Sequence, residues 1–82
     1  MKIIDYYKTS DLGLAAAIAL YYPVDLIDKS NPRRAVFAFV REEGIDQCIE
    51  GFWSGELKVT PREYFSQIKY LKSRLYEEEG RV

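Results

Sequence analysis

Residues 35–40 read Ala-Val-Phe-Ala-Phe-Val (AVFAFV), a run that is apolar at every position. Side chains alternate between the two faces of a β-strand, so both faces of this strand would be apolar. Such a run is typical of a central strand that is covered on both faces. The sequence therefore predicts a central strand over residues 34–40. It would be covered on both faces within the chain, or by helices on one face and a second subunit on the other.

Two further strands are predicted before this run, at residues 1–7 and 24–28. Both are short segments with β-branched and aromatic side chains, which favour strands. Asn31 and Pro32 lie in the turn-forming segment that follows the second of them. We therefore expect a three-stranded sheet whose last two strands are joined by a tight turn.

An alanine-rich helix is predicted over residues 12–22, between the first two strands. Pro23 would end this helix, because proline cannot continue one. The segment before it offers three side chains that commonly cap a helix N-terminus: Thr9, Ser10 and Asp11. Small alanine side chains let a helix lie close to a sheet, so we expect this helix to be buried.

The second half of the chain predicts two amphipathic helices. In the first, apolar side chains recur every three or four residues in a stripe that consists of Ile45, Cys48, Ile49, Phe52 and Trp53. We expect Cys48 to be a buried thiol and Trp53 to anchor the core. Gly55 would end this helix.

The last helix would begin at Pro61, after the capping residue Thr60. Its apolar face is predicted to hold Tyr64, Phe65, Ile68, Leu71 and Leu75, and its opposite face Arg62, Ser66, Lys69 and Ser73. Acidic side chains at 77–82 oppose the helix dipole, so we expect the helix to fray there. The element order β-α-β-β-α-α predicts a single α+β domain over residues 1–82, a small three-stranded sheet with three helices.

The sequence contains no histidine and one cysteine. This excludes histidine-activated nucleophiles and a structural zinc site. Neither of the two common glycine-rich phosphate loops is present. Oxygen ligands for Mg²⁺ could come from Glu42, Glu43, Asp46 and Glu50, but three of them are spaced as on the solvated face of a helix. We therefore expect no enzymatic activity, no metal site and no cofactor.

No secretion signal and no membrane span is predicted. The longest apolar run, residues 12–24, is shorter than the roughly 20 residues that cross a bilayer. A lone cysteine cannot form an intrachain disulfide, which fits the reducing cytoplasm. We expect a cytoplasmic protein without a membrane partner.

Charge is segregated along a chain whose formal net charge is only −1. Residues 29–41 and 57–76 are strongly basic, whereas residues 42–56 carry acidic side chains and no basic ones. Lysine and arginine are the side chains that most often contact phosphate oxygens. Our leading hypothesis is a small non-enzymatic module that contacts the DNA or RNA backbone through Arg33, Arg34, Lys58, Arg62, Lys69 and Lys72.

Two alternatives compete with this hypothesis. The basic side chains could pair with the acidic helix at 45–54, and either Arg33 or Arg34 is expected to reach it. The chain could instead be a homo-oligomeric interaction module, such as a homodimer, with no nucleic-acid role. The run at 35–40 and the seven tyrosines motivate the second alternative, because so small a chain cannot bury them all.

Three motifs extend the analysis: Lys-Thr-Ser-Asp-Leu at 8–12, Asn-Pro-Arg-Arg at 31–34 and Trp-x-Gly-Glu-Leu-x-Val-x-Pro-Arg at 53–62. With them the chain resembles a family of short, uncharacterised bacterial and phage-associated proteins that is catalogued only as a domain of unknown function. The resemblance extends from about Tyr6 to Tyr76. It implies a cytoplasmic protein of prokaryotic or phage origin and a compact α+β domain, and it implies no activity.

Overall fold

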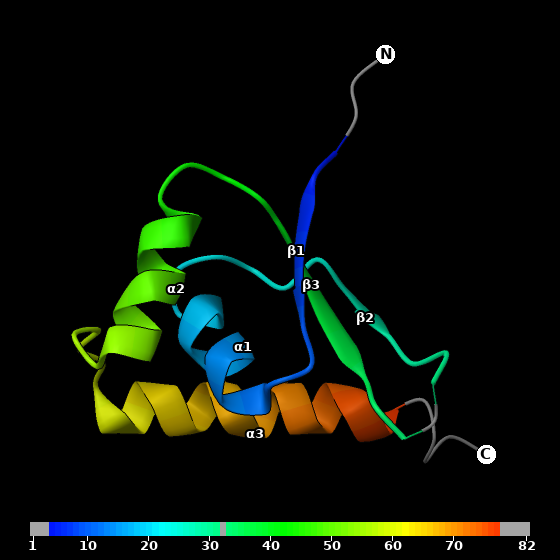
Figure 1. Ribbon diagram of the computed structural model, residues 1–82. Coiled ribbons are helices and arrows are strands. Elements are labelled where there is room, and N and C mark those ends of the chain that lie inside the picture. Colours follow the sequence, from blue (N-terminus) through cyan, green and yellow to red (C-terminus); the bar gives the residue numbers. More distant parts are fainter. Residues whose placement is uncertain (1–3, 32, 78–82) are drawn as a thin grey trace.

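The computed structural model describes residues 4–31 and 33–77. Its elements are the strands β1 (Tyr6–Thr9), β2 (Leu26–Asp28) and β3 (Val36–Val40), and the helices α1 (Leu12–Ala19), α2 (Ile45–Ser54) and α3 (Pro61–Glu77) (Figure 1). The protein thus has the predicted α+β fold, with the order β-α-β-β-α-α.

β3 is the central strand of the sheet, whose strand order is β1-β3-β2. Both neighbours run antiparallel to it, so that Tyr7 faces Phe39 and Ile27 faces Phe37. This confirms the prediction that the run at 35–40 forms a central strand.

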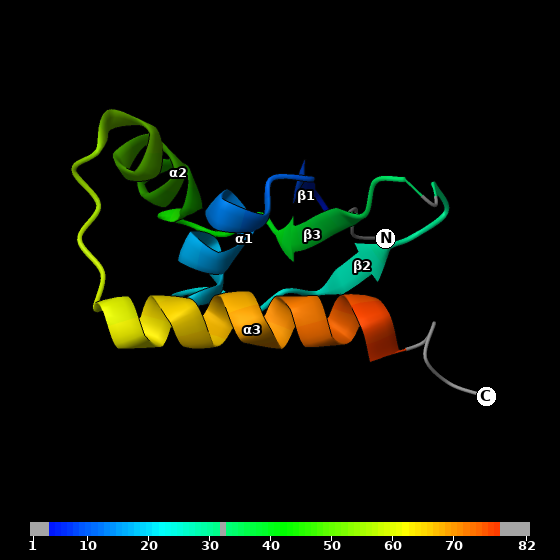
Figure 2. The same cartoon turned by 90° about the horizontal axis from the view of Figure 1, so that it is seen from below.

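All three helices lie on the same side of the sheet, as Figures 1 and 2 show together. α1 lies between the other two, because both α2 and α3 pack against it. Ala15, Ala16 and Ala17 are buried in this helix, as its alanine-rich sequence predicted. Their small side chains leave room for neighbours on more than one side of α1.

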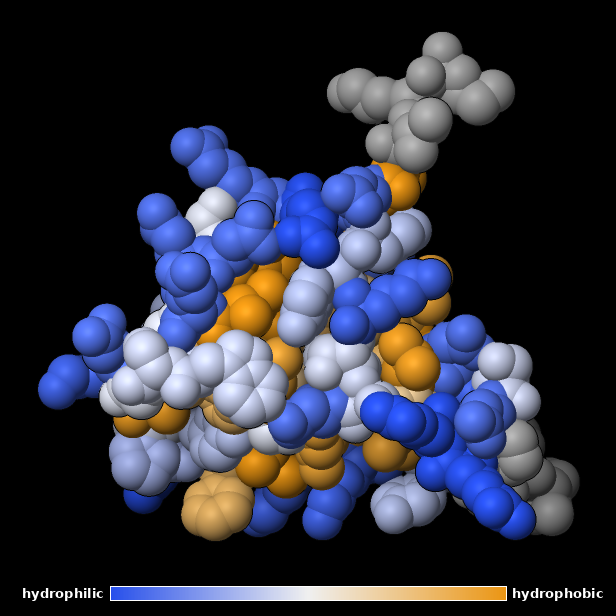
Figure 3. All heavy atoms as spheres, in the orientation of Figure 1, coloured by the Kyte–Doolittle hydropathy of each residue, from blue (hydrophilic) through white to orange (hydrophobic). Residues whose placement is uncertain are grey.

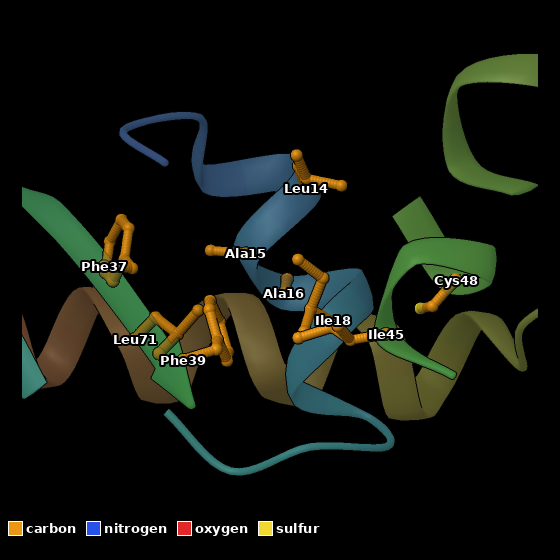
Figure 4. Close-up of a cluster of buried hydrophobic side chains, with 9 residues drawn as sticks. All are labelled: Leu14, Ala15, Ala16, Ile18, Phe37, Phe39, Ile45, Cys48 and Leu71. Atoms are coloured by element: carbon orange, nitrogen blue, oxygen red, sulfur yellow. The ribbon is translucent and has the colours of Figure 1, made fainter. Parts of the chain in front are cut away.

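One cluster of buried side chains joins β3 to the three helices (Figure 4). Its largest fully buried members are Phe37 and Phe39 of β3, Leu14 and Ile18 of α1, Ile45 of α2 and Leu71 of α3. Burying an apolar side chain of this size stabilises the fold by about 1.5–3 kcal/mol. The cluster therefore ties every helix to the inner face of the central strand.

No helix within the described part of the chain covers the opposite face of the sheet. Val36, Ala38 and Val40 alternate with the buried phenylalanines and so face away from the helices. Leu26, which lies beside Ala38, is 43 % exposed. In Figure 3, apolar surface shows between hydrophilic side chains over the region of the sheet. Among the described residues, helices therefore cover one face of β3, and a second subunit on its other face stays a prediction.

β2 is shorter than its predicted range, and β1 is shifted: it begins at Tyr6 and extends two residues beyond its predicted end at Tyr7, to Thr9. The pairing of β1 starts at Tyr6, which faces Val40, the last residue of β3. A strand extends only where a partner supplies hydrogen bonds, so the end of β3 limits β1. The predicted start at residues 1–3 lies outside the described residues, as does the fraying expected at 78–82.

α1 ends at Ala19, three residues before its predicted end at Tyr22. The N–H groups of Leu20 and Tyr21 bond three residues back, to the carbonyls of Ala17 and Ile18, so the chain tightens into a turn there. Pro23 then keeps Tyr22 out of the helical conformation. At the other end, the carboxylate of Asp11 accepts a hydrogen bond from the N–H of Leu14 at 3.1 Å. Asp11 is therefore the side chain that caps α1.

α2 has its predicted bounds, but its last aromatic residue lies outside the core. Ile45 and Cys48 are buried, whereas Trp53 is 63 % exposed. At about 100° per residue, Trp53 lies at the edge of the apolar stripe. It packs edge-on against the ring of Phe52, with 5.0 Å between ring centroids. The prediction that Trp53 anchors the core is wrong.

Gly44→Ala is expected to lower the free energy of unfolding by about 1–3 kcal/mol. Gly44 precedes α2 with a φ of 92°, and a Cβ atom built there would lie 2.6 Å from the hydroxyl of Tyr22. That hydroxyl donates a hydrogen bond to the carbonyl of Glu43, so moving it has a cost of its own. Urea unfolding followed by circular dichroism measures the change.

Gly55→Ala is the matched control for this substitution. Gly55 also has a positive φ, 80°, but no atom lies within 4 Å of a Cβ atom built there. Gly55→Ala should lower the free energy of unfolding only by the cost of the left-handed backbone, about 1–2 kcal/mol. Equal losses in the two variants would contradict a role for the Tyr22 contact.

Candidate nucleic-acid interface

α3 carries two stripes of side chains on two different sides of the helix. The first faces the core and consists of Tyr64, Ile68, Leu71 and Leu75. The second consists of five exposed residues, Arg62, Phe65, Lys69, Lys72 and Tyr76. Both repeat every three or four residues, the spacing that lines up side chains along one side of an α-helix. We call the second set the basic–aromatic stripe.

α3 forms one edge of the molecule in both views of the ribbon, with α1 and the sheet on its inner side (Figures 1 and 2). A helix in this position buries one side only. Its remaining surface, including the basic–aromatic stripe, is open to solvent over about 20 Å of helix length.

Phe65 lies at the surface of α3 and is 63 % exposed. It lies about 90° around the helix from the line of Ile68 and Leu71, too far to share their contacts. The prediction of Phe65 on the apolar face is therefore wrong. Together with Arg62, Ser66 and Lys69 it lines a shallow depression of about 450 Å³.

The basic turn between β2 and β3 meets the C-terminal end of α3. A second depression of about 300 Å³ is lined by Lys29, Asn31, Arg33, Arg34, Ala35, Leu75 and Tyr76. The ammonium of Lys29 donates a hydrogen bond to the carbonyl of Leu75, which places a cation at the negative end of the helix dipole. Because Tyr76 belongs to the stripe and to this depression, Arg33 and Arg34 lie at one end of the stripe.

Hydrogen bonds within the turn position these two arginines. The carboxylate of Asp28 accepts one from the N–H of Ser30 at 2.9 Å, and the side-chain oxygen of Asn31 accepts one from the N–H of Arg33 at 3.0 Å. The hydrogen bonds from Ser30 hold the pKa of the Asp28 carboxyl below its usual value. Pro32, to which we also attributed the turn, lies outside the described residues.

The six predicted contact residues form no ion pair with a carboxylate among residues 4–31 and 33–77. Arg34 donates a hydrogen bond from Nε to the hydroxyl of Ser10 at 2.8 Å. The expected pairing of Arg33 or Arg34 with the acidic helix is wrong, because the turn and α2 lie at opposite ends of the molecule (Figure 1). The arginine that pairs with α2 is Arg41, 2.7 Å from Asp46.

Lys58 differs from the other predicted contact residues. It lies in the connection between α2 and α3 and lines neither of the two depressions. Its carbonyl accepts a hydrogen bond from the hydroxyl of Tyr21 at 3.5 Å. The structure thus brings Arg62, Lys69 and Lys72 together on the stripe, with Arg33 and Arg34 at its end, and leaves Lys58 apart.

Sequence reasoning missed Phe65 as a surface residue of this site. The signal that could have found it is its spacing from Arg62, Lys69 and Lys72, which matches their own repeat. The same residue also directly follows Tyr64, which begins the core stripe. A large apolar side chain next to a core position is more often buried, so the pattern favoured the wrong assignment.

Comparison of the chain with known protein families matches residues 4–77 to the domain of unknown function DUF5659. The chain belongs to this family. The match spans most of the chain and confirms the resemblance to a family without an assigned activity. No curated protein and no solved structure matches the chain significantly.

Other chemistry within the described part of this DUF5659 domain is limited. No three or more of its acidic, cysteine or histidine side chains are grouped so that they could hold a metal ion. In addition, none of its described helices is long and apolar enough to cross a membrane. The exposed cations and aromatic rings of α3 and of the turn remain its most distinctive surface chemistry.

Cys48 is expected to react with a thiol reagent at least about tenfold more slowly in the folded domain than in the unfolded chain. The side chain is buried in the core cluster, and this burial raises the pKa of the thiol. Both effects lower the concentration of accessible thiolate at pH 8. Labelling with Ellman's reagent, with and without guanidinium chloride, measures the ratio, and equal rates would contradict the assignment of Cys48 as a structural thiol.

Proposed function

We propose that this DUF5659 domain is a small, non-enzymatic module that binds the sugar–phosphate backbone of DNA or RNA. The observation that carries the proposal is the alignment of Arg62, Lys69 and Lys72 on one exposed side of α3, with the two arginines of the turn at its end. Counterion release makes such a row of cations a favourable surface for a polyanion.

The stripe itself contains three basic residues and no acidic one. The only acidic residue between Pro61 and Tyr76 is Glu63, which is not a member of the stripe. The acidic side chains of α2 belong to a helix that packs against α1 rather than against α3. A chain of nearly neutral net charge can therefore present a locally positive surface.

The proposed contact residues are Arg33, Arg34, Lys58, Arg62, Lys69 and Lys72. The five that lie on or next to the stripe would make the main phosphate contacts, and Lys58 a peripheral one. We propose no catalytic residue and no cofactor. We also propose that the protein is cytoplasmic and of prokaryotic or phage origin, in keeping with its single buried cysteine.

Binding to nucleic acid is expected to weaken by about 100- to 500-fold between about 50 and 200 mM salt if all five cations contact phosphates. Arg62→Ala and Lys69→Ala are each expected to reduce the slope of log K against log salt by about one. Fluorescence anisotropy with labelled DNA and RNA at several salt concentrations measures both.

Lys8→Ala serves as the matched control for these variants. It removes the same charge, but from an exposed position in β1, on the face of the sheet opposite the helices. Its salt slope should equal that of the unchanged protein. If Lys8→Ala lowers the slope as much as Lys69→Ala does, binding reflects net charge and not the stripe. Absence of binding at 50 mM salt would refute the proposed function.

Self-association is a second candidate function, and a separate observation favours it. Ala38 is already buried on the face of the sheet opposite the helices, but Leu26 is 43 % exposed there and Val36 and Val40 are only half-buried. A second copy of the chain would bury these side chains, as the alternative of a homo-oligomeric module with no nucleic-acid role requires.

Leu26→Lys is expected to convert a dimer into a monomer if this face is the interface, because it places a charge in the buried contact. Multi-angle light scattering measures the mass. Trp53→Lys, which changes a more exposed apolar residue on α2, should leave the mass unchanged. A monomeric mass for the unchanged protein at high concentration would rule this candidate out.

A further inference from the structure

We infer that the basic–aromatic stripe binds single-stranded nucleic acid and that the ring of Phe65 stacks on an unpaired base. The inference rests on the proposed function. It adds the substrate class, a single strand, and a role for Phe65, which contacts to phosphates alone do not require. The ring of Phe65 is 63 % exposed and lies outside the core.

Phe65 is flanked by cations on its own side of α3. Arg62 precedes it by three residues and Lys69 follows it by four, so both side chains extend alongside the ring. With Ser66, these residues line the depression that holds the ring. An isolated exposed phenylalanine needs no explanation, but one set between two cations and a hydroxyl offers a stacking surface beside phosphate-binding groups.

The exposed ring favours a single strand over a duplex. Base pairs in a duplex hide the faces of their bases, so a duplex offers phosphates to Arg62 and Lys69 but no surface to Phe65. A single strand offers both, and base–aromatic stacking tolerates any sequence because every base has a π-face. The arrangement of ring and cations therefore matches an unpaired strand whose phosphates contact Arg62 and Lys69 while one of its bases stacks on Phe65.

A second aromatic ring lies at the other end of the stripe. Tyr76 is 63 % exposed, is separated from Phe65 by about 16 Å of helix, and lines the depression of Arg33 and Arg34. Lys69 and Lys72 lie between the two rings. A strand of several nucleotides that runs along α3 would meet a ring, then cations, then a second ring with the arginines of the turn.

Trp53 shows that exposure alone does not create such a site. It is 63 % exposed, as Phe65 is, but the depression around it is lined by Glu50 and Glu56. These carboxylates repel phosphates. Trp53 is therefore a matched control, an equally exposed aromatic ring in the opposite electrostatic setting.

The experiment compares Phe65→Ala with Trp53→Ala by fluorescence anisotropy at about 50 mM salt. The probes are a labelled single-stranded oligonucleotide of about 12 nucleotides, as DNA and as RNA, and a duplex of the same sequence. Phe65→Ala should weaken single-strand binding about 5- to 100-fold and change duplex binding by less than about twofold. Trp53→Ala should change neither, and Phe65→Tyr should restore single-strand binding.

The salt dependence separates this inference from the proposed function. Phe65→Ala should keep the salt slope of the unchanged protein, because it removes no phosphate contact, whereas Lys69→Ala should lower it. The inference would be overturned if Phe65→Ala left salt-dependent binding intact, or if the duplex and the single strand bound equally well. The proposed function would stand in either case. No binding of any probe would overturn both, and circular dichroism confirms that each variant is folded.

Discussion

The burial of Phe37 and Phe39 on the inner face of β3 is the contact on which the rest of the structure depends. Both side chains are almost completely inaccessible, and the cluster that encloses them includes residues from all three helices. Because α1 is short and lined with alanines, it can lie between the other two helices while the sheet stays within reach of α3. Leu71 supplies the contribution of α3 to this cluster.

The same packing leaves α3 with a free side. A helix that lies at the edge of a small fold needs only one narrow stripe of apolar residues, and the remaining positions are available for other purposes. Here those positions hold Phe65, with Arg62 and Lys69 on either side of it. Phe65 is 63 % exposed and therefore contributes little to the core. The placement of α2 at the other end of the molecule (Figure 1) keeps its two acidic residues, Asp46 and Glu50, away from this surface. The acidic residues of α2 and the basic residues of α3 are thus separated in the fold, although the two helices are neighbours in the sequence.

Much of the fold was predictable from local signals. The uninterrupted apolar run at 35–40, the alanines of α1, the periodic stripe of α2 and the Thr60-Pro61 start of α3 specified the element types, because each rests on backbone geometry or on side-chain periodicity. The segregation of basic residues could also be read from the sequence, and five of the six predicted contact residues do gather on or beside one helix. The bounds of the elements were less predictable, since the first residue of β1 depends on where its partner strand β3 ends.

By itself, the sequence determined the order of the elements, the central strand and the charge of each segment, all of which depend on neighbouring residues. Only the tertiary structure decided which apolar side chains the core accepts. Phe65 and Trp53 look like core residues in a local window, yet both are exposed, whereas Ile68 and Cys48 of the same helices belong to the core packing. It also decided that the turn meets the end of α3 rather than α2. Such outcomes depend on contacts between segments that are distant in the chain, and no local pattern records them.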